Sequence, residues 1–200
     1  MDWNEFLHEA VSERDVDLAR QALAQGANPN GLGEDGATLL YHAVSYGNID
    51  TALALLKGGA LVAADRDEEA QTLHAAVEDA NLPMVNLLLD FDGAVALNWF
   101  DYVDRTPLTI AVERGCIEIA RCLIEAGADV NAHNESKIGD TALHRAAENG
   151  TMEMVQLLLK SGADPTIKGW MWITPLERAR RRKRGDGRAF TNCWNRPRSD

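Results

Sequence analysis

The stretch Asp140-Thr141-Ala142-Leu143-His144-Arg145-Ala146-Ala147, followed after a helical run by Gly162-Ala163-Asp164, decides the fold of this chain. From Leu143, a leucine recurs every 33 to 35 residues in both directions, with an alanine three residues after each one. The leucines are Leu7, Leu40, Leu73, Leu108, Leu143 and Leu176, and the alanines are Ala10, Ala43, Ala76, Ala111, Ala146 and Ala179. Residues three apart share a face of a helix. A period of this length predicts stacked repeats.

Two further signals keep the same period. Glycine stands seven residues after three of the leucines, at Gly47, Gly115 and Gly150, where a positive φ is expected to end a first helix. Gly-Ala follows each of the first five leucines by 19 or 20 residues, at 26–27, 59–60, 93–94, 127–128 and 162–163. Between these signals, residues 117–124 and 154–159 place apolar side chains at helical spacing, which predicts second helices with one buried face.

These residues resemble the ankyrin repeat, a β-turn followed by two antiparallel helices over about 33 residues. The resemblance is closest at 140–147, at Thr106-Pro107-Leu108-Thr109-Ile110-Ala111 and at Thr174-Pro175-Leu176. It implies an all-α solenoid of stacked helix-turn-helix units with short β-hairpin turns, about five repeats long, with a C-terminal half-repeat as a cap. Such end units need polar outer faces, which Asp17 and Arg20 are expected to give at one end and residues 178–184 at the other.

The expected array covers residues 1–184, and residues 185–200 are expected to form a flexible C-terminal tail. Its parts are an N-terminal capping repeat at 1–30, repeats at 31–63, 64–98, 99–132 and 133–168, and a C-terminal cap at 169–184. The third repeat departs most from the pattern, with Gln71-Thr72 in place of Thr-Pro, Ala80 in place of glycine and two extra residues within 90–97. It is therefore expected to be the least regular.

Charge is distributed unevenly along the chain. The net charge is −11, but residues 169–200 carry +6 and residues 1–168 carry −17. A body this acidic is expected to attract a basic protein and to repel nucleic acid and anionic membranes. No apolar stretch is long enough for a membrane span, and the acidic N-terminus does not resemble a secretory signal, so a cytoplasmic protein is expected.

The histidines and cysteines give no evident catalytic or metal site. His8, His74 and His144 each follow an anchor leucine, and the resemblance implies that they bond within the turn and to the neighbouring repeat. Stacked helices lie about 10 Å apart, too far for such histidines to share one metal ion. His42 and His133 have no evident partner. The three cysteines form no CxxC pair and are expected to stay reduced. We therefore expect no catalytic residue, cofactor, metal or small-molecule substrate, and no enzyme.

The ankyrin resemblance implies that a partner docks on the hairpin tips and the exposed side of the first helices. The sequence positions that match this concave face are acidic in the middle and aromatic toward the C-terminus, and Tyr and Trp are frequent interface anchors. The expected partner-binding residues are Glu34, Asp35, Tyr46, Asp67, Glu68, Glu78, Asp79, Trp99, Phe100, Tyr102, Glu113, Arg114, Ile138, Glu148, Trp170 and Trp172. Two simpler interpretations stay open: the acidic residues serve solubility alone, or Trp170 and Trp172 cover the open core of the last repeat.

The predicted function is that of a non-enzymatic protein-binding module, monomeric when free, that inhibits or shields a basic protein. One specific version is an immunity protein that neutralises a cationic toxin such as a nuclease. Two rival functions are a scaffold for several partners and a nucleic-acid binder that uses the basic run at 178–188. That run equally fits the solvated face of a capping helix, where cations favour the C-terminal end.

Overall fold

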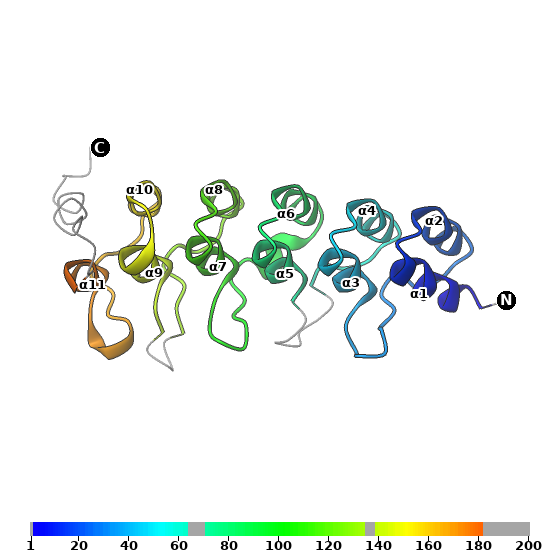
Figure 1. Ribbon diagram of the computed structural model, residues 1–200, viewed down its shortest axis with the longest axis horizontal. Helices are drawn as coiled ribbons and strands as arrows, with labels where there is room; N and C mark the ends of the chain where they lie inside the picture. Colours follow the sequence, from blue (N-terminus) through cyan, green and yellow to red (C-terminus); the bar gives the residue numbers. More distant parts are fainter. Residues whose placement is uncertain (1, 64–70, 135–138, 182–200) are drawn as a thin grey trace. The chain divides into compact units, whose positions relative to one another are not determined.

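The chain folds into short antiparallel helix pairs joined by protruding loops (Figure 1). A computed structural model describes residues 2–63, 71–134 and 139–181. Among these residues the only extended pairing is an isolated antiparallel bridge between Leu32 and Thr38. The chain divides into two compact units, Met1–Leu97 (unit 1) and Asn98–Asp200 (unit 2).

In unit 1 the described residues form three helix pairs and a short 3-10 helix. The elements are α1 (Trp3–Glu13), α2 (Val16–Ala24), α3 (Leu39–Ser45), α4 (Ile49–Lys57), α5 (Thr72–Glu78), α6 (Leu82–Leu89) and η1 (Gly93–Ala96). Helices α1, α3 and α5 lie in one layer and α2, α4 and α6 in the other, and each helix packs on its counterpart in the next pair (Figure 1).

The described residues of unit 2 repeat this arrangement, and the last helix among them is α11. Its elements are α7 (Pro107–Glu113), α8 (Ile117–Glu125), α9 (Ala142–Asn149), α10 (Met152–Lys160), η3 (Trp170–Trp172) and α11 (Pro175–Arg181). The first helices α7, α9 and α11 pack in series, and α10 packs against both α8 and α9.

The leucine and alanine of each repeat form the core. The first five anchor leucines are at most 1% exposed, and so are the six alanines. Leu176 is half-buried, because the described helix α11 packs on one neighbour, α9. From α3 to α11 the first helices are only seven or eight residues long. Helices this short are not stable alone, so packing of the apolar stripe stabilises them.

Side-chain caps decide where several of these short helices begin. The Thr106 hydroxyl accepts a hydrogen bond from the Thr109 backbone N–H at 3.2 Å, and Thr38 accepts one from Tyr41 at 3.1 Å. Second helices begin in the same way: Asn48 accepts from the N–H of Thr51 at 3.2 Å. Each cap satisfies a backbone donor that a helix start leaves unpaired.

Asparagine side chains join the loops of successive repeats. In unit 1, Asn30 accepts a hydrogen bond from the Leu61 N–H at 2.9 Å and donates one to the Gly59 carbonyl at 3.1 Å. In unit 2, Asn131 repeats both bonds, accepting from the Asp164 N–H at 2.7 Å and donating to the Gly162 carbonyl at 3.2 Å. Each amide therefore satisfies a backbone donor and a backbone acceptor one repeat away, which fixes the stacking distance.

The glycines that end the first helices differ from the prediction at one position. Gly47 and Gly115 have positive φ values of 68° and 71°, as predicted. At Gly150 the prediction is wrong, because φ is −72° there and α9 continues to Asn149. Glycine is still needed at this position for another reason: a Cβ atom would lie 2.7 Å from the Ala146 carbonyl oxygen.

In the third repeat, Ala80 occupies the position that glycine fills at Gly47 and Gly115, and its φ is 52°. A side chain with a Cβ atom is strained in this left-handed region. Ala80→Gly is therefore expected to raise the free energy of unfolding by about 0.5–1 kcal/mol, measured by urea denaturation followed by circular dichroism.

The matched control is Gly47→Ala, where a Cβ atom would meet nothing within 4 Å, so only the backbone strain changes. It is expected to destabilise the protein by a similar amount, about 1 kcal/mol. Equal stabilities for the Ala80→Gly variant and the wild type would show that the strain at Ala80 is relieved elsewhere.

Candidate functional site

The candidate surface consists, in each unit, of the loops before the first helices and the exposed side of those helices. In unit 1 it carries carboxylates that face solvent. Glu34 and Asp35 are exposed in the loop before α3, Asp79 is exposed at the end of α5, and Glu78 is half-buried. The predicted residues Asp67, Glu68 and Ile138 lie outside the described residues, as do the tail and the tip of the loop before α9.

Asp35 is the best-defined of these carboxylates. It accepts hydrogen bonds from the Ala37 N–H at 3.2 Å and from His42 Nε2 at 3.0 Å. The Ala37 N–H, and after it His42, hold the pKa of Asp35 below its usual value, so it remains charged. The expectation that His42 has no partner is therefore wrong, since the loop folds back and places Asp35 against it.

Aromatic rings lie beside this acidic loop on α3. The Tyr46 ring is 42% exposed, and its centroid lies 6.0 Å from that of His42. The Arg14 guanidinium lies 5.4 Å from the Tyr46 ring centroid, a cation–π contact that orients the ring. Tyr46 is thus held in place by Arg14, and 42% of the residue remains exposed.

In unit 2 four carboxylates of the candidate surface, Asp101, Glu113, Asp140 and Glu148, are paired with arginines. Arg105 binds Asp101 at 2.8 Å and reaches Glu113 at 3.5 Å. Arg145 binds the other oxygen of Glu113 at 3.2 Å and lies 3.7 Å from Asp140. These contacts form one network across the loops and first helices of two successive repeats.

Arg178 completes this ionic network from the cap helix α11. Its guanidinium binds both oxygens of Asp140, at 2.7 and 3.1 Å, and Glu148 at 3.1 Å. The side chains of Arg178 and Asp140 are 9% and 5% exposed. The expectation that Arg178 lies on a solvated outer face is therefore wrong, whereas Arg180 and Arg181 are exposed. Glu113 and Glu148, predicted to bind a partner, each have an internal cation.

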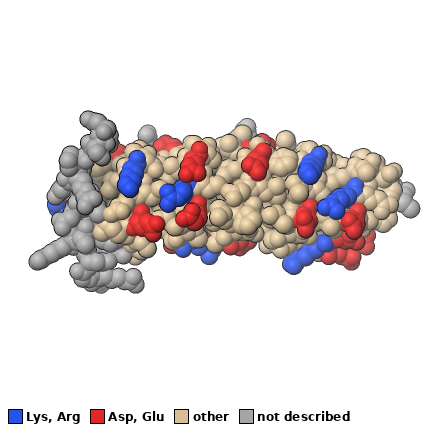
Figure 2. Space-filling view, turned by 90° about the horizontal axis from the view of Figure 1, so that it is seen from above, with Lys and Arg blue, Asp and Glu red and all other residues tan. Residues whose placement is uncertain are grey.

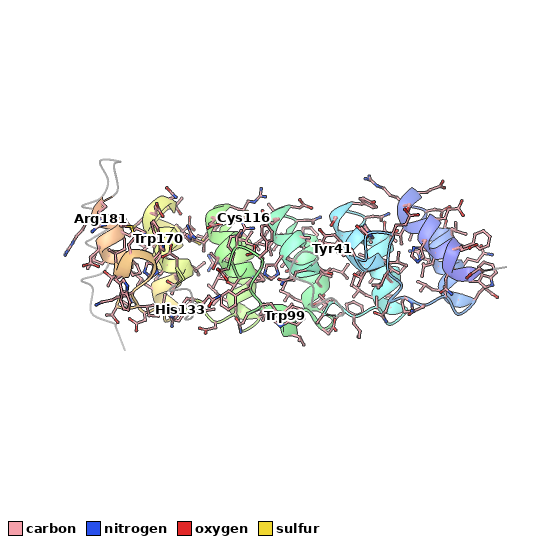
Figure 3. The ribbon with its side chains drawn as sticks, turned by 90° about the horizontal axis from the view of Figure 1, so that it is seen from below. Tyr41, Trp99, Cys116, His133, Trp170 and Arg181 are labelled. Carbon is pink, nitrogen blue, oxygen red and sulfur yellow. The ribbon has the colours of Figure 1, made fainter. Side chains whose placement is uncertain are left out.

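The predicted aromatic residues do not form one cluster. Trp99 and Phe100 are half-buried, while Tyr102 on the same loop is 66% exposed. Trp170 and Trp172 lie on another loop, before α11, and are 63% and 66% exposed, so they do not cover the core of the last repeat. Figure 3 shows Trp99 and Trp170 well apart within unit 2. Arg114 is exposed at the end of α7.

His144 confirms the expected structural role of the histidine after the anchor leucine. Its Nδ1 accepts hydrogen bonds from the Thr141 hydroxyl at 2.9 Å and the Thr141 N–H at 3.1 Å. Its Nε2 donates to the Ile173 carbonyl, 3.1 Å away in the cap loop. The two bonds accepted by Nδ1 require the neutral ring, and burial lowers the pKa of His144.

Lowering the pH is expected to destabilise unit 2 through His144. Above about pH 6.5, the usual histidine pKa, the ring is neutral in the folded and unfolded chain alike. Below it, the unfolded chain takes up a proton before the folded chain does, so the free energy of unfolding falls. Urea denaturation from about pH 7.5 to 5.5 measures this slope, and His144→Gln is expected to flatten it. An equal slope in the variant would assign the effect to other groups.

Other chemistry is not indicated among the described residues. His133 Nδ1 donates to the Asn131 carbonyl at 2.8 Å, so this histidine also has a partner that the sequence did not reveal. No group of three or more His, Cys, Asp or Glu side chains is placed to hold a metal ion in the ranges that the structure covers. None of the described helices is long and apolar enough to cross a membrane.

The face formed by the second helices differs from the candidate surface. Figure 2, which views the protein from this side, shows acidic and basic side chains interspersed. In unit 1 it carries Asp50 and Lys57, and in unit 2 it carries Glu118 and Arg121, which pair at 3.6 Å. Mixed charge of this kind is what solubility alone requires.

Stacked antiparallel helix pairs with buried leucine–alanine stripes and protruding loops define a helical repeat protein. The ankyrin-repeat family model (three copies) matches residues 7–98 and 97–169, and the chain belongs to this family. An ankyrin repeat domain from Acinetobacter baumannii AYE is 31% identical, with a TM-score of 0.82 and 94% of each chain covered. The human ASB11 ankyrin repeat domain is 27% identical, with a TM-score of 0.76 over 96% of this chain and 83% of that one.

Sequence relatives share the repeats but are longer proteins. A putative ankyrin repeat protein of fowlpox virus is 32% identical over 113 residues, which make up 56% of this chain and 26% of the viral protein. This chain thus spans about a quarter of that relative's length. The ankyrin repeat is a protein-interaction module that presents an extended surface to its partner, and it is typically non-catalytic.

Proposed function

We propose that this protein binds a basic protein partner through the loop and first-helix surface of unit 1, and thereby inhibits or shields it. The observation that carries the proposal is the solvent-facing set Glu34, Asp35 and Asp79, with Glu78 half-buried beside them. Carboxylates in this position attract a cationic partner, raise its association rate and orient its docking. Tyr46, exposed beside them, supplies apolar contact area with a polar hydroxyl.

The carboxylates of this surface in unit 2 are paired differently from those in unit 1. In unit 2 the carboxylates Asp101, Asp140, Glu113 and Glu148 have arginine partners at 2.7 to 3.5 Å. A basic partner would have to displace these arginines there, which costs free energy. The proposal therefore assigns the attraction of cations to unit 1.

The test compares two variants with the same loss of negative charge. The surface variant carries Glu34→Ser, Asp35→Ser, Glu78→Ser and Asp79→Ser. The control carries Asp50→Ser, Glu118→Ser, Glu125→Ser and Glu153→Ser, all on the exposed side of second helices. The partner is captured from native lysate, identified and purified, and the association rate is measured by surface plasmon resonance.

The surface variant is expected to associate about tenfold more slowly at low salt, with a smaller change in dissociation rate. The association rate of the control variant is expected to stay within a factor of about two of the wild-type rate, because the carboxylates that it lacks lie on another face. Equal slowing in both variants would mean that net charge, rather than this surface, attracts the partner.

One specific form of the proposal is an immunity protein that neutralises a cationic toxin such as a nuclease. A scaffold for several partners is a second form. An assay that detects two different proteins bound to this protein at the same time would distinguish it. Nucleic-acid binding through residues 178–188 is the alternative from another class, and filter binding over a salt series tests it. Arg178 is already bound to Asp140 and Glu148, which reduces the cations available for that role.

A further inference from the structure

The loop before α11 carries the most exposed run of large apolar side chains among the described residues. Trp170, Met171 and Trp172 are consecutive and are 63%, 60% and 66% exposed. They form the short helix η3 at the tip of this loop, away from α9 and α11 (Figure 1). Exposure of this much apolar surface costs free energy in water and marks an interaction site.

The backbone of this loop is held in a conformation that its residues do not prefer. Met171 and Trp172 have positive φ values of 62° and 59°, a region that side chains with a Cβ atom rarely adopt. The Trp172 N–H donates to the Gly169 carbonyl at 3.0 Å, and the Gly169 N–H donates to the Ile173 carbonyl at 3.0 Å. A strained segment persists only where its surroundings fix it, and such segments cluster at functional sites.

Two buried side chains, one on α9 and one on the loop before it, fix the loop before α11 in place. Asp140 accepts the Trp170 N–H at 3.0 Å, and Arg178 holds that carboxylate through both its oxygens. His144 Nε2 donates to the Ile173 carbonyl at 3.1 Å. The side chain of Asp140 is 5% exposed and His144 is fully buried, so the loop stands on a rigid base. The two tryptophans are therefore presented without the entropy loss that a mobile loop would suffer on binding.

Charges close to this loop are matched. Glu177 accepts hydrogen bonds from the Thr174 N–H at 2.7 Å and hydroxyl at 3.1 Å, and Lys168 and Arg181 lie close enough to help lower its pKa. Asp140 and Glu148 are bound by Arg178. Among the described residues, charged groups of both signs thus lie close to the apolar tip, whereas the residues named at the surface of unit 1 are acidic.

We infer that residues 170–172 are a preorganised apolar anchor that inserts into an uncharged, apolar pocket of a partner protein, at a site chemically distinct from the acidic surface of unit 1. The inference rests on the proposed protein-binding function. A protruding tip of two tryptophans and a methionine fits a pocket, and tryptophan is the residue most enriched among interface hot spots.

The test uses full-length protein as bait for a displayed library of random peptides about 12 residues long, whose selected members report the preferred chemistry of each site. Four proteins are compared: wild type, an anchor variant with Trp170→Ser, Met171→Ser and Trp172→Ser, the acidic-surface variant described above, and a control with Leu61→Ser and Val95→Ser. The control removes two exposed apolar side chains of unit 1 that are not among the expected partner-binding residues. Circular dichroism and urea denaturation verify that each variant is folded.

Wild type is expected to select a class of peptides rich in Leu, Phe and Trp with little net charge. Their affinity, measured by fluorescence anisotropy, is expected to fall at least about thirtyfold in the anchor variant, the effect of losing a hot spot. It is expected to change less than about twofold in the other two variants and between about 50 and 300 mM salt, because few unpaired charges are involved.

The inference fails if no apolar peptides are selected, if the anchor variant binds them as wild type does, or if the peptides that depend on the anchor are strongly charged. Basic peptides that depend on Glu34, Asp35, Glu78 and Asp79 would still support the proposed function in each case. Vesicles of neutral phosphatidylcholine form a separate arm. Vesicle binding that the anchor variant loses, without any apolar peptide class, would assign the tip to a lipid surface and overturn the inference.

Discussion

Replacing Arg178 with alanine is expected to lower the free energy of unfolding of unit 2 by about 3–5 kcal/mol. The Arg178 side chain is 9% exposed, and its guanidinium binds both oxygens of Asp140, at 2.7 and 3.1 Å, a carboxylate whose side chain is 5% exposed. Without it, a nearly buried negative charge keeps only Arg145, 3.7 Å away, and the Trp170 N–H. The Asp140 carboxylate is then neither hydrated by solvent nor paired with a cation at short distance. Urea denaturation followed by circular dichroism gives the change in stability.

Two companion variants separate the causes. Arg180→Ala, on the exposed side of the same helix, is expected to change stability by less than about 0.5 kcal/mol. Combining Arg178→Met with Asp140→Asn removes both charges and is expected to recover part of the loss, since a buried pair often contributes little net stability. A double variant as unstable as Arg178→Ala would instead assign the loss to packing of the arginine side chain.

Replacing Leu108 with alanine is expected to cost about 3 kcal/mol, within the 2–5 kcal/mol range for a buried leucine. Leu108 is 1% exposed on α7, and α7 packs against both α8 and α9. The cost has two parts: the apolar area of leucine that is no longer buried, and the cavity that its side chain leaves. The neighbouring Ala111 is too small to fill this cavity. In a repeat array the defect also weakens the interface with the next repeat of unit 2, which includes α9.

The matched control is Leu176→Ala, the same position of the pattern in the cap. Leu176 is half-buried, and its helix α11 packs on α9 with no helix described on the other side. The cost is expected to be below about 1.5 kcal/mol, because water replaces the deleted atoms more easily at an open face. Equal losses at both positions would show that the cap is as tightly enclosed as an internal repeat.

Much of the fold follows from local pattern. The period of leucine and alanine predicts the buried stripe of every repeat, and the structure buries the first five leucines and all six alanines. The ladder formed by Asn30 and Asn131 was not foreseen, although each stands four residues after the glycine of a Gly-Ala pair. That fixed offset is the signal that would have revealed it.

The candidate site followed less directly from the sequence. Exposure of Glu34, Asp35 and Tyr46 was predicted, because loop tips and exposed helix faces follow from the repeat register. The partners of Glu113 and Glu148 were not predicted, since Arg145 and Arg178 lie 32 and 30 residues further along the chain. Many carboxylates and arginines are available at those separations, and the pattern does not indicate which of them meet.

By itself the sequence determined the helices and their buried faces, because each depends on side chains within one or two turns of helix. It also determined the repeat and the family, because the spacing of leucine and alanine along the chain indicates both. Tertiary structure alone decided which charges remain open to a partner. Ion pairing requires two groups within about 4 Å after the loops have folded back, and only the stacked repeats bring Asp140, Glu148 and Arg178 to that distance. The same stacking turned Trp170 and Trp172 outward, because the Asp140 carboxylate binds the backbone of their loop and leaves both rings in solvent.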